Sequence, residues 1–201
     1  MRSPRYLTRA AIAFGLLGLG GCLSVLPEPA MPDALYQIDA PTERQPLAAH
    51  IIIREPNAPQ IVAGRAMVSE DNSGATRLVP AVEWSGRSTR LLQLALVDSF
   101  AVGGSGAALL PDTGVDAPYA LSSRLQAFEL HGDEAVCDVS VVLHETGVAR
   151  QYFKQSEVSV RRPVAGGSTA DRALAMKAAA QQCVVEVSEF VSKTLAERAQ
   201  P

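Results

Sequence analysis

Histidine and cysteine are scarce in this chain, and each occurs only three times in 201 residues. No two of them have a Cys-x-x-Cys or His-x-x-x-His spacing, which would bring metal ligands together on one turn or one helix face. The sequence therefore predicts no metal site, and the histidines are expected at the surface. They are His50, His131 and His144.

Catalytic motifs are also missing. The chain has no Gly-x-Ser-x-Gly nucleophile elbow, no Walker loop and no dinucleotide-binding fingerprint. Its glycine-rich stretch, residues 103–106, has no strand leading directly into it and no helix after it, so it indicates a flexible turn. We expect no catalytic residue, no cofactor and no enzymatic activity.

Runs of basic residues are short, and the longest is Arg161-Arg162. Phosphate binding needs a clustered basic surface, so nucleic acid is not expected as a partner. A polybasic membrane patch is excluded for the same reason, and any membrane contact should come mainly from a lipid.

The N-terminus contains a specific sequence pattern for protein processing. Three arginines precede the apolar run 10–19, and residues 19–22 read Leu-Gly-Gly-Cys. The run is too short to span a bilayer, so this is the pattern of a bacterial lipoprotein signal over residues 1–21, with Cys22 as the lipidated first residue of the mature protein. The competing interpretation is a buried N-terminal helix with an ordinary cysteine.

The mature chain divides into a tether and one domain. Residues 22–33 contain three prolines and no periodic pattern, which indicates an extended lipidated tether. Residues 34–201 are of the length of a single domain. The signal holds three of the 18 basic side chains and none of the 21 acidic ones, so the mature chain has 15 basic and 21 acidic groups and a net charge near −6. Leu23 follows Cys22 where an aspartate would favour the inner membrane, so the outer membrane is expected.

The first half of the domain alternates in hydrophobicity. Strands are predicted at residues 35–38 and 50–53, and a hairpin at residues 64–68 and 75–79 that Pro80 ends. A helix follows over residues 82–100, where the period changes to about 3.6. Trp84, at its start, is expected in the core rather than exposed as a partner anchor.

The second half predicts three long antiparallel strands over residues 119–162, with a bulge between Leu125 and Phe128 where the alternation changes phase. A long amphipathic helix follows, which Ser168 or Thr169 can cap. The predicted fold class is α+β, a mostly antiparallel sheet with two amphipathic helices packed on one face.

Two cysteines remain in the domain. Cys137 shares a strand face with Val139 and Val141, and Cys183 lies on the apolar stripe of the last helix, so both should be buried where helix meets sheet. Whether they form a disulfide or stay free depends on register, and the sequence leaves both outcomes open.

The order of these features resembles the ABC-type transport auxiliary lipoproteins. That family accompanies MCE-type (mammalian cell entry) lipid transporters and includes the lipoprotein of the paraquat-inducible transport system. The resemblance covers nearly all of the mature chain, except that the stretch 103–106 stands where family members usually show a clearer strand. It is carried by the lipobox and tether, Leu35-Tyr36-Gln37-Ile38, Glu83-Trp84, Tyr119-Ala120-Leu121, Phe128-Glu129, Arg150-Gln151-Tyr152-Phe153 and the alanine-rich C-terminal helix.

The resemblance implies a non-catalytic auxiliary component of a transport system that moves lipids or other hydrophobic molecules between the inner and outer membranes. Its partners would be an MCE-domain protein with an ABC permease and ATPase on other chains. The protein would be anchored in the outer membrane and face the periplasm. From the family's functional residues, only the acylated cysteine maps onto this chain, at Cys22.

A surface for such partners is suggested by the first strand. A short strand directly after a tether often lies at a sheet edge, where its backbone can accept a partner strand. The candidate residues are Leu35, Tyr36, Gln37 and Ile38, and the alternative is that this is simply the first strand of the sheet. Two other functions stay open, a tethered periplasmic lipid carrier and, less favoured, an envelope hydrolase.

Overall fold

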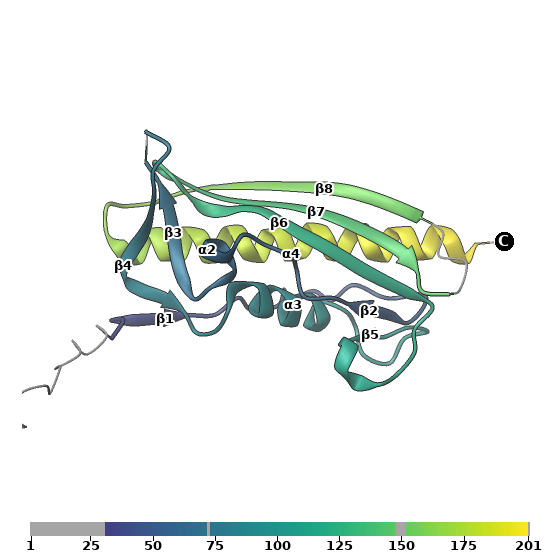
Figure 1. The fold of residues 1–201 in the computed structure, drawn as a ribbon. Coiled ribbons are helices and arrows are strands. Elements are labelled where there is room, and N and C mark those ends of the chain that lie inside the picture. Colours follow the sequence, from purple (N-terminus) through teal and green to yellow (C-terminus); the bar gives the residue numbers. More distant parts are fainter. Residues whose placement is uncertain (1–30, 72, 148–151, 201) are drawn as a thin grey trace, which may run out of the picture. The chain divides into compact units, whose positions relative to one another are not determined.

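The computed structural model describes residues 31–71, 73–147 and 152–200 (Figure 1). The predicted signal peptide, Cys22 and the tether up to residue 30 lie outside the described residues. Residues Pro32–Pro201 form one compact unit. Within the described residues, no helix has both the length and the hydropathy that crossing a membrane requires.

Three long strands form one side of the sheet. They are β6 (Tyr119–His131), β7 (Glu134–Glu145) and β8 (Tyr152–Pro163), and each pairs antiparallel with the next. The β6–β7 register shifts between Leu125 and Ala127. These observations confirm the three predicted strands and the predicted bulge.

On its other side, β6 is lined by two short strands in succession. The start of β6 pairs in parallel with β2 (Ile51–Ile53), and its end pairs in parallel with β3 (Ala66–Glu70). Beyond β2 lies β5 (Ala108–Leu109), also parallel. β5 is a two-residue strand directly after the glycine-rich stretch.

The sheet continues from β3 to β4 (Thr76–Trp84), which pairs antiparallel with it as the predicted hairpin, and ends at β1 (Ala34–Tyr36), parallel to β4. Among the described residues the sheet therefore has eight strands, and four of its seven strand pairings are parallel. The prediction of a mostly antiparallel sheet was wrong. The alternation of apolar and polar residues indicates which face of a strand is buried. It does not indicate which strands pair with each other, because that depends on how the short strands are connected.

The predicted helix 82–100 is also corrected. β4 does not end at Pro80 but runs through it to Trp84, and the helix α3 spans only Ser88–Asp98. Ala81 has a φ of +64°, and the β3–β4 register shifts there, so the proline sits at a bulge where the ladder is already interrupted. Trp84 is 1 % exposed, and its ring stacks on Phe128 with centroids 5.2 Å apart, which confirms its predicted burial but in a strand.

The last helix, α4 (Thr169–Ala199), begins with a capping box. Ser168 Oγ accepts a hydrogen bond from the Asp171 backbone N–H, and the Asp171 carboxylate accepts one from the Ser168 N–H. The hydrogen bonds from Ser168 lower the pKa of Asp171. This confirms Ser168 as the cap.

The two predicted helices meet over one face of the sheet. Leu92 of α3, Val184 of α4 and Val139 of β7 line the same small cavity in the core, so both helices cover the inner face of the long strands. A short helix, α2 (Gln60–Ala63), and a 3-10 turn at Pro111–Thr113 were not predicted.

One residue of the glycine-rich stretch, Gly106, packs closely against another part of the backbone. Gly106 is buried, and a Cβ atom there would lie 2.2 Å from the carbonyl oxygen of Ala49. The next residue, Ala107, accepts a backbone hydrogen bond from Ile51 of β2. Glycine at 106 is therefore required by the close approach of two backbones and not by turn flexibility.

Candidate functional site: the β1 edge

β1 forms one edge of the described sheet. Among the described strands it pairs with β4 alone, in the register Ala34 to Val82, Leu35 to Glu83 and Tyr36 to Trp84. The carbonyl of Tyr36 accepts a hydrogen bond from the Ser85 N–H at 2.7 Å, so the backbone of Tyr36 faces β4. Successive residues of a strand direct their backbone groups to opposite sides, so those of Leu35 and Gln37 point to the open side.

The four candidate residues have distinct environments. Leu35 is 54 % exposed, and Gln37 is also exposed. Tyr36 is half-buried and packs against the core, and Ile38 is buried just beyond the strand. Tyr36 and Ile38 therefore hold the segment against the core. Leu35 and Gln37 leave backbone groups and the Leu35 side chain accessible at the open edge.

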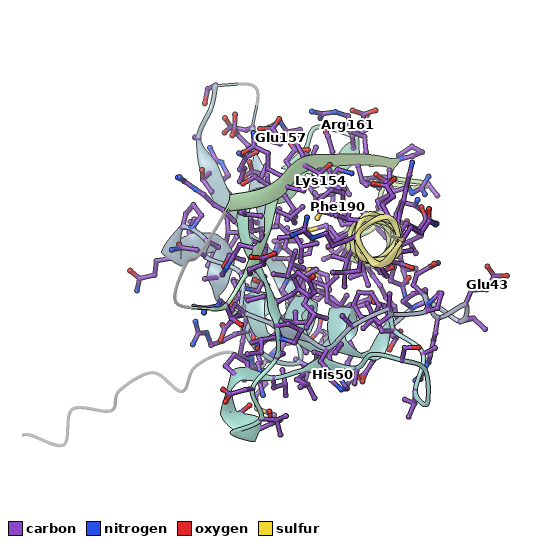
Figure 2. The ribbon with its side chains drawn as sticks, turned by 90° about the vertical axis from the view of Figure 1, so that its right-hand side faces the viewer. Glu43, His50, Lys154, Glu157, Arg161 and Phe190 are labelled. Carbon is purple, nitrogen blue, oxygen red and sulfur yellow. The ribbon has the colours of Figure 1, made fainter. Side chains whose placement is uncertain are left out.

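A second edge of the described sheet, β8, is built differently. β8 pairs only with β7 among the described strands and is much longer than β1. It carries charged and exposed side chains along its length, including Lys154, Glu157 and Arg161 (Figure 2). Charges on an edge strand discourage pairing with another strand. β1, whose sequence is Ala-Leu-Tyr, has no such protection.

The two domain cysteines lie together in the core, as predicted for helix against sheet. Both are free thiols and both are buried. The Cys183 thiol donates a hydrogen bond to the Cys137 carbonyl at 3.1 Å. Burial, and then contact with Cys183, raises the pKa of Cys137 well above its usual value. A neutral, buried thiol is a poor nucleophile, so this pair does not resemble a catalytic cysteine site.

The three histidines are dispersed. His50 is exposed, and His131 lies beside Glu70 and Glu129 at the end of the sheet. His144 is half-buried, with Nε2 at 3.3 Å from Ser122 Oγ and Nδ1 at 3.1 Å from the Glu145 carbonyl oxygen. This serine–histidine contact joins neighbouring strands, and a backbone carbonyl stands where a hydrolase triad has a carboxylate, so it is a cross-strand hydrogen bond.

Among the described residues, the cavity found in the core leaves little space for a ligand. The cavity between α3, α4 and the sheet has a volume of about 10 Å³, which is the room for one water. A larger hollow of about 490 Å³ opens at the surface, and half of its lining is polar. Its lining residues are Ala40, Pro41, Thr42, Arg162, Ala178, Gln181, Gln182 and Val185.

The fold and the edge together define a small α+β domain that presents an open strand directly after its N-terminal segment. The chain belongs to the family of ABC-type transport auxiliary lipoprotein components, whose model matches residues 34–188.

Solved structures share this fold. Protein XCC0632 from Xanthomonas campestris is 18 % identical, with a TM-score of 0.68 over 85 % of this chain and 98 % of that one. The hypothetical protein CT253 from Chlamydia trachomatis is 8 % identical, with a TM-score of 0.50 over 74 % of this chain and 98 % of that one. A search of curated proteins finds no match.

Proposed function

We propose that this lipoprotein is a non-catalytic auxiliary component of an MCE-type ABC transport system, and that it recognises its partner through the open edge of β1. The partner would be an MCE-domain protein that works with a permease and an ATPase. The protein would be anchored through a lipid on Cys22, in the outer membrane and facing the periplasm.

The observation that carries the proposal is the uncharged edge strand. Leu35 is more than half exposed, and the backbone of Leu35 and Gln37 faces away from β4. An added strand would receive main-chain hydrogen bonds from this edge and an apolar contact from Leu35. The family membership supports a transport partner as the source of that strand.

A tethered lipid carrier is the second candidate, and the cavities favour it less. A carrier has to enclose acyl chains in an apolar pocket, and pockets for drug-sized ligands already measure about 300–1,000 Å³. The apolar cavity in the core is far smaller, and the larger surface hollow is half polar.

Co-purification tests the proposal. Tagged full-length protein is isolated from detergent-solubilised membranes of its own bacterium, with Leu35→Glu as the variant and Leu174→Glu as the control. Both leucines are 54 % exposed, but Leu174 lies on α4. We expect wild type and Leu174→Glu to capture MCE, permease or ATPase subunits, and Leu35→Glu to lose them.

Two results would contradict the proposal. If wild-type protein captures none of these subunits and instead carries stoichiometric phospholipid, the carrier function is favoured. If Leu35→Glu and Leu174→Glu capture the subunits equally, the β1 edge is not the contact.

A further inference from the structure

A second group of side chains lies at the end of β3 and β6, away from the β1 edge. Glu70 is the last residue of β3, and it is in register with His131, the last residue of β6. Glu129 precedes His131 by two positions, so the side chains of both point to the same face of the strand. Residues from two separate strands are thereby brought to one place.

We propose that Glu70, Glu129 and His131 form a binding site for a divalent transition-metal ion of the zinc class. His131 Nε2 lies 3.0 Å from Glu129 Oε1 and 3.7 Å from Glu70 Oε2. One ligand atom from each of the three residues lies within 4.8 Å of the others. Three donors bound to one zinc ion at about 2 Å are roughly 3.3 Å apart, so small side-chain rotations bring these atoms to coordinating distance.

The charges around the group favour a cation. Two carboxylates converge here, and within the described residues neither forms an ion pair with a lysine or arginine. The Glu129 side chain is only 15 % exposed, which reduces the screening of its charge by water. A divalent ion would neutralise both carboxylates at once.

The ligand chemistry selects the class of metal. An imidazole nitrogen with two carboxylate oxygens suits zinc and similar transition metals, whereas magnesium prefers oxygen ligands alone and keeps most of its waters. Three protein ligands leave a coordination position for water, and His131, at 41 % exposed, leaves the site open to solvent.

The site has a structural consequence that does not depend on the proposed transport function. β3 pairs with β6 at only two register positions, Ser69 to Leu130 and Glu70 to His131. β4 and β1 join the rest of the sheet through β3. Figure 1 shows the ends of β3 and β6 and the start of β7 meeting at one end of the sheet. A metal bridging Glu70 to His131 would clamp this short junction.

The experiment is a titration of untagged full-length protein in detergent with zinc chloride at pH 7.5, followed by calorimetry, with magnesium chloride as a comparison. We expect one zinc per chain and no saturable magnesium binding. Glu129→Gln and His131→Gln should weaken zinc binding at least tenfold. His50→Gln removes an exposed histidine elsewhere and should leave the affinity unchanged.

Circular dichroism checks that each variant folds, and Glu70→Gln, at a half-buried strand end, replaces Glu129→Gln if that variant misfolds. Zinc should also raise the melting temperature of wild type but not of His131→Gln, because it binds only the folded chain. The proposal is overturned if wild type shows no saturable zinc binding. It is equally overturned if folded Glu70→Gln and His131→Gln bind as wild type does, or if His50→Gln weakens binding as much as His131→Gln does.

Discussion

Cys22 is the residue on which the membrane assignment depends. Its thiol is the only group in the Leu-Gly-Gly-Cys motif that can accept the diacylglyceryl group. We predict that Cys22→Ser is not acylated and accumulates as uncleaved or mislocalised precursor. Metabolic labelling with a radioactive fatty acid checks this, and label retained by the Cys22→Ser protein would refute the assignment.

The core thiols give a second test at this scale. We predict that Cys137 and Cys183 are both free, so that denatured protein takes up two alkyl groups without reductant. In the native state alkylation should be slow, because both thiols are buried and burial raises the pKa of Cys137. Mass spectrometry measures the shift, and alkylation that requires reductant even after denaturation would show a disulfide instead.

Single residues show where sequence reasoning succeeds and where it fails. Trp84 was predicted to be buried because large aromatic side chains gain most from leaving water, and it is. The grouping of Glu70 with His131 was not predicted. Their spacing in the sequence is 61 positions, and only the parallel register of β3 with β6 brings them together. A local motif search has no signal for such a pair.

Among the structural elements, the loop at Gly106 makes the sharpest prediction. Gly106→Ala should lower the free energy of unfolding by roughly 1–3 kcal/mol, because the new methyl group would overlap the Ala49 backbone. Gly104→Ala is the control, since a Cβ atom there meets only ordinary contacts. Urea unfolding compares the two variants, and equal stabilities would contradict the packing that we describe.

Elements with a strong local pattern were predicted well. α4 has a long apolar stripe and a capping box, and β6 shows its bulge as a change of phase at Leu125. The segment 82–84 was assigned to a helix because its apolar residues also fit a period of 3.6. Its conformation is decided by pairing with β1 and β3, and pairing partners are distant in the sequence.

For the molecule as a whole, binding and folding should be separable at the β1 edge. Gln37→Pro removes a backbone N–H that faces the open side, and the extended conformation that proline imposes on the preceding residue is the one Tyr36 already has in β1. We predict weaker capture of transport subunits with a melting temperature within about 2 °C of wild type. Thermal unfolding and co-purification are measured on the same preparation. A large loss of stability would show that the segment is part of the folding core.

The topology of the whole sheet could not be predicted from the sequence. The long strands β6, β7 and β8 follow one another closely in the sequence, and strands joined by short connections are antiparallel neighbours. β1, β2, β3 and β5 reach their places by crossovers, and the sequence of each is too short to specify a partner. The position of the open edge therefore had to come from the structure. The sequence alone had suggested the first strand as a candidate edge.

The position of β1 also determines how the domain would respond to mechanical load. If Cys22 is anchored as proposed, any pull from the membrane enters the domain along the chain that leads into Ala34. The first connections to bear it are the Asp33 N–H bond to the Ala81 carbonyl and the three register pairs between β1 and β4. The packing of Ala34 and Tyr36 against the core bears part of the same load. Tension on the tether would therefore detach the very strand that we propose for partner binding, before it disturbs the core.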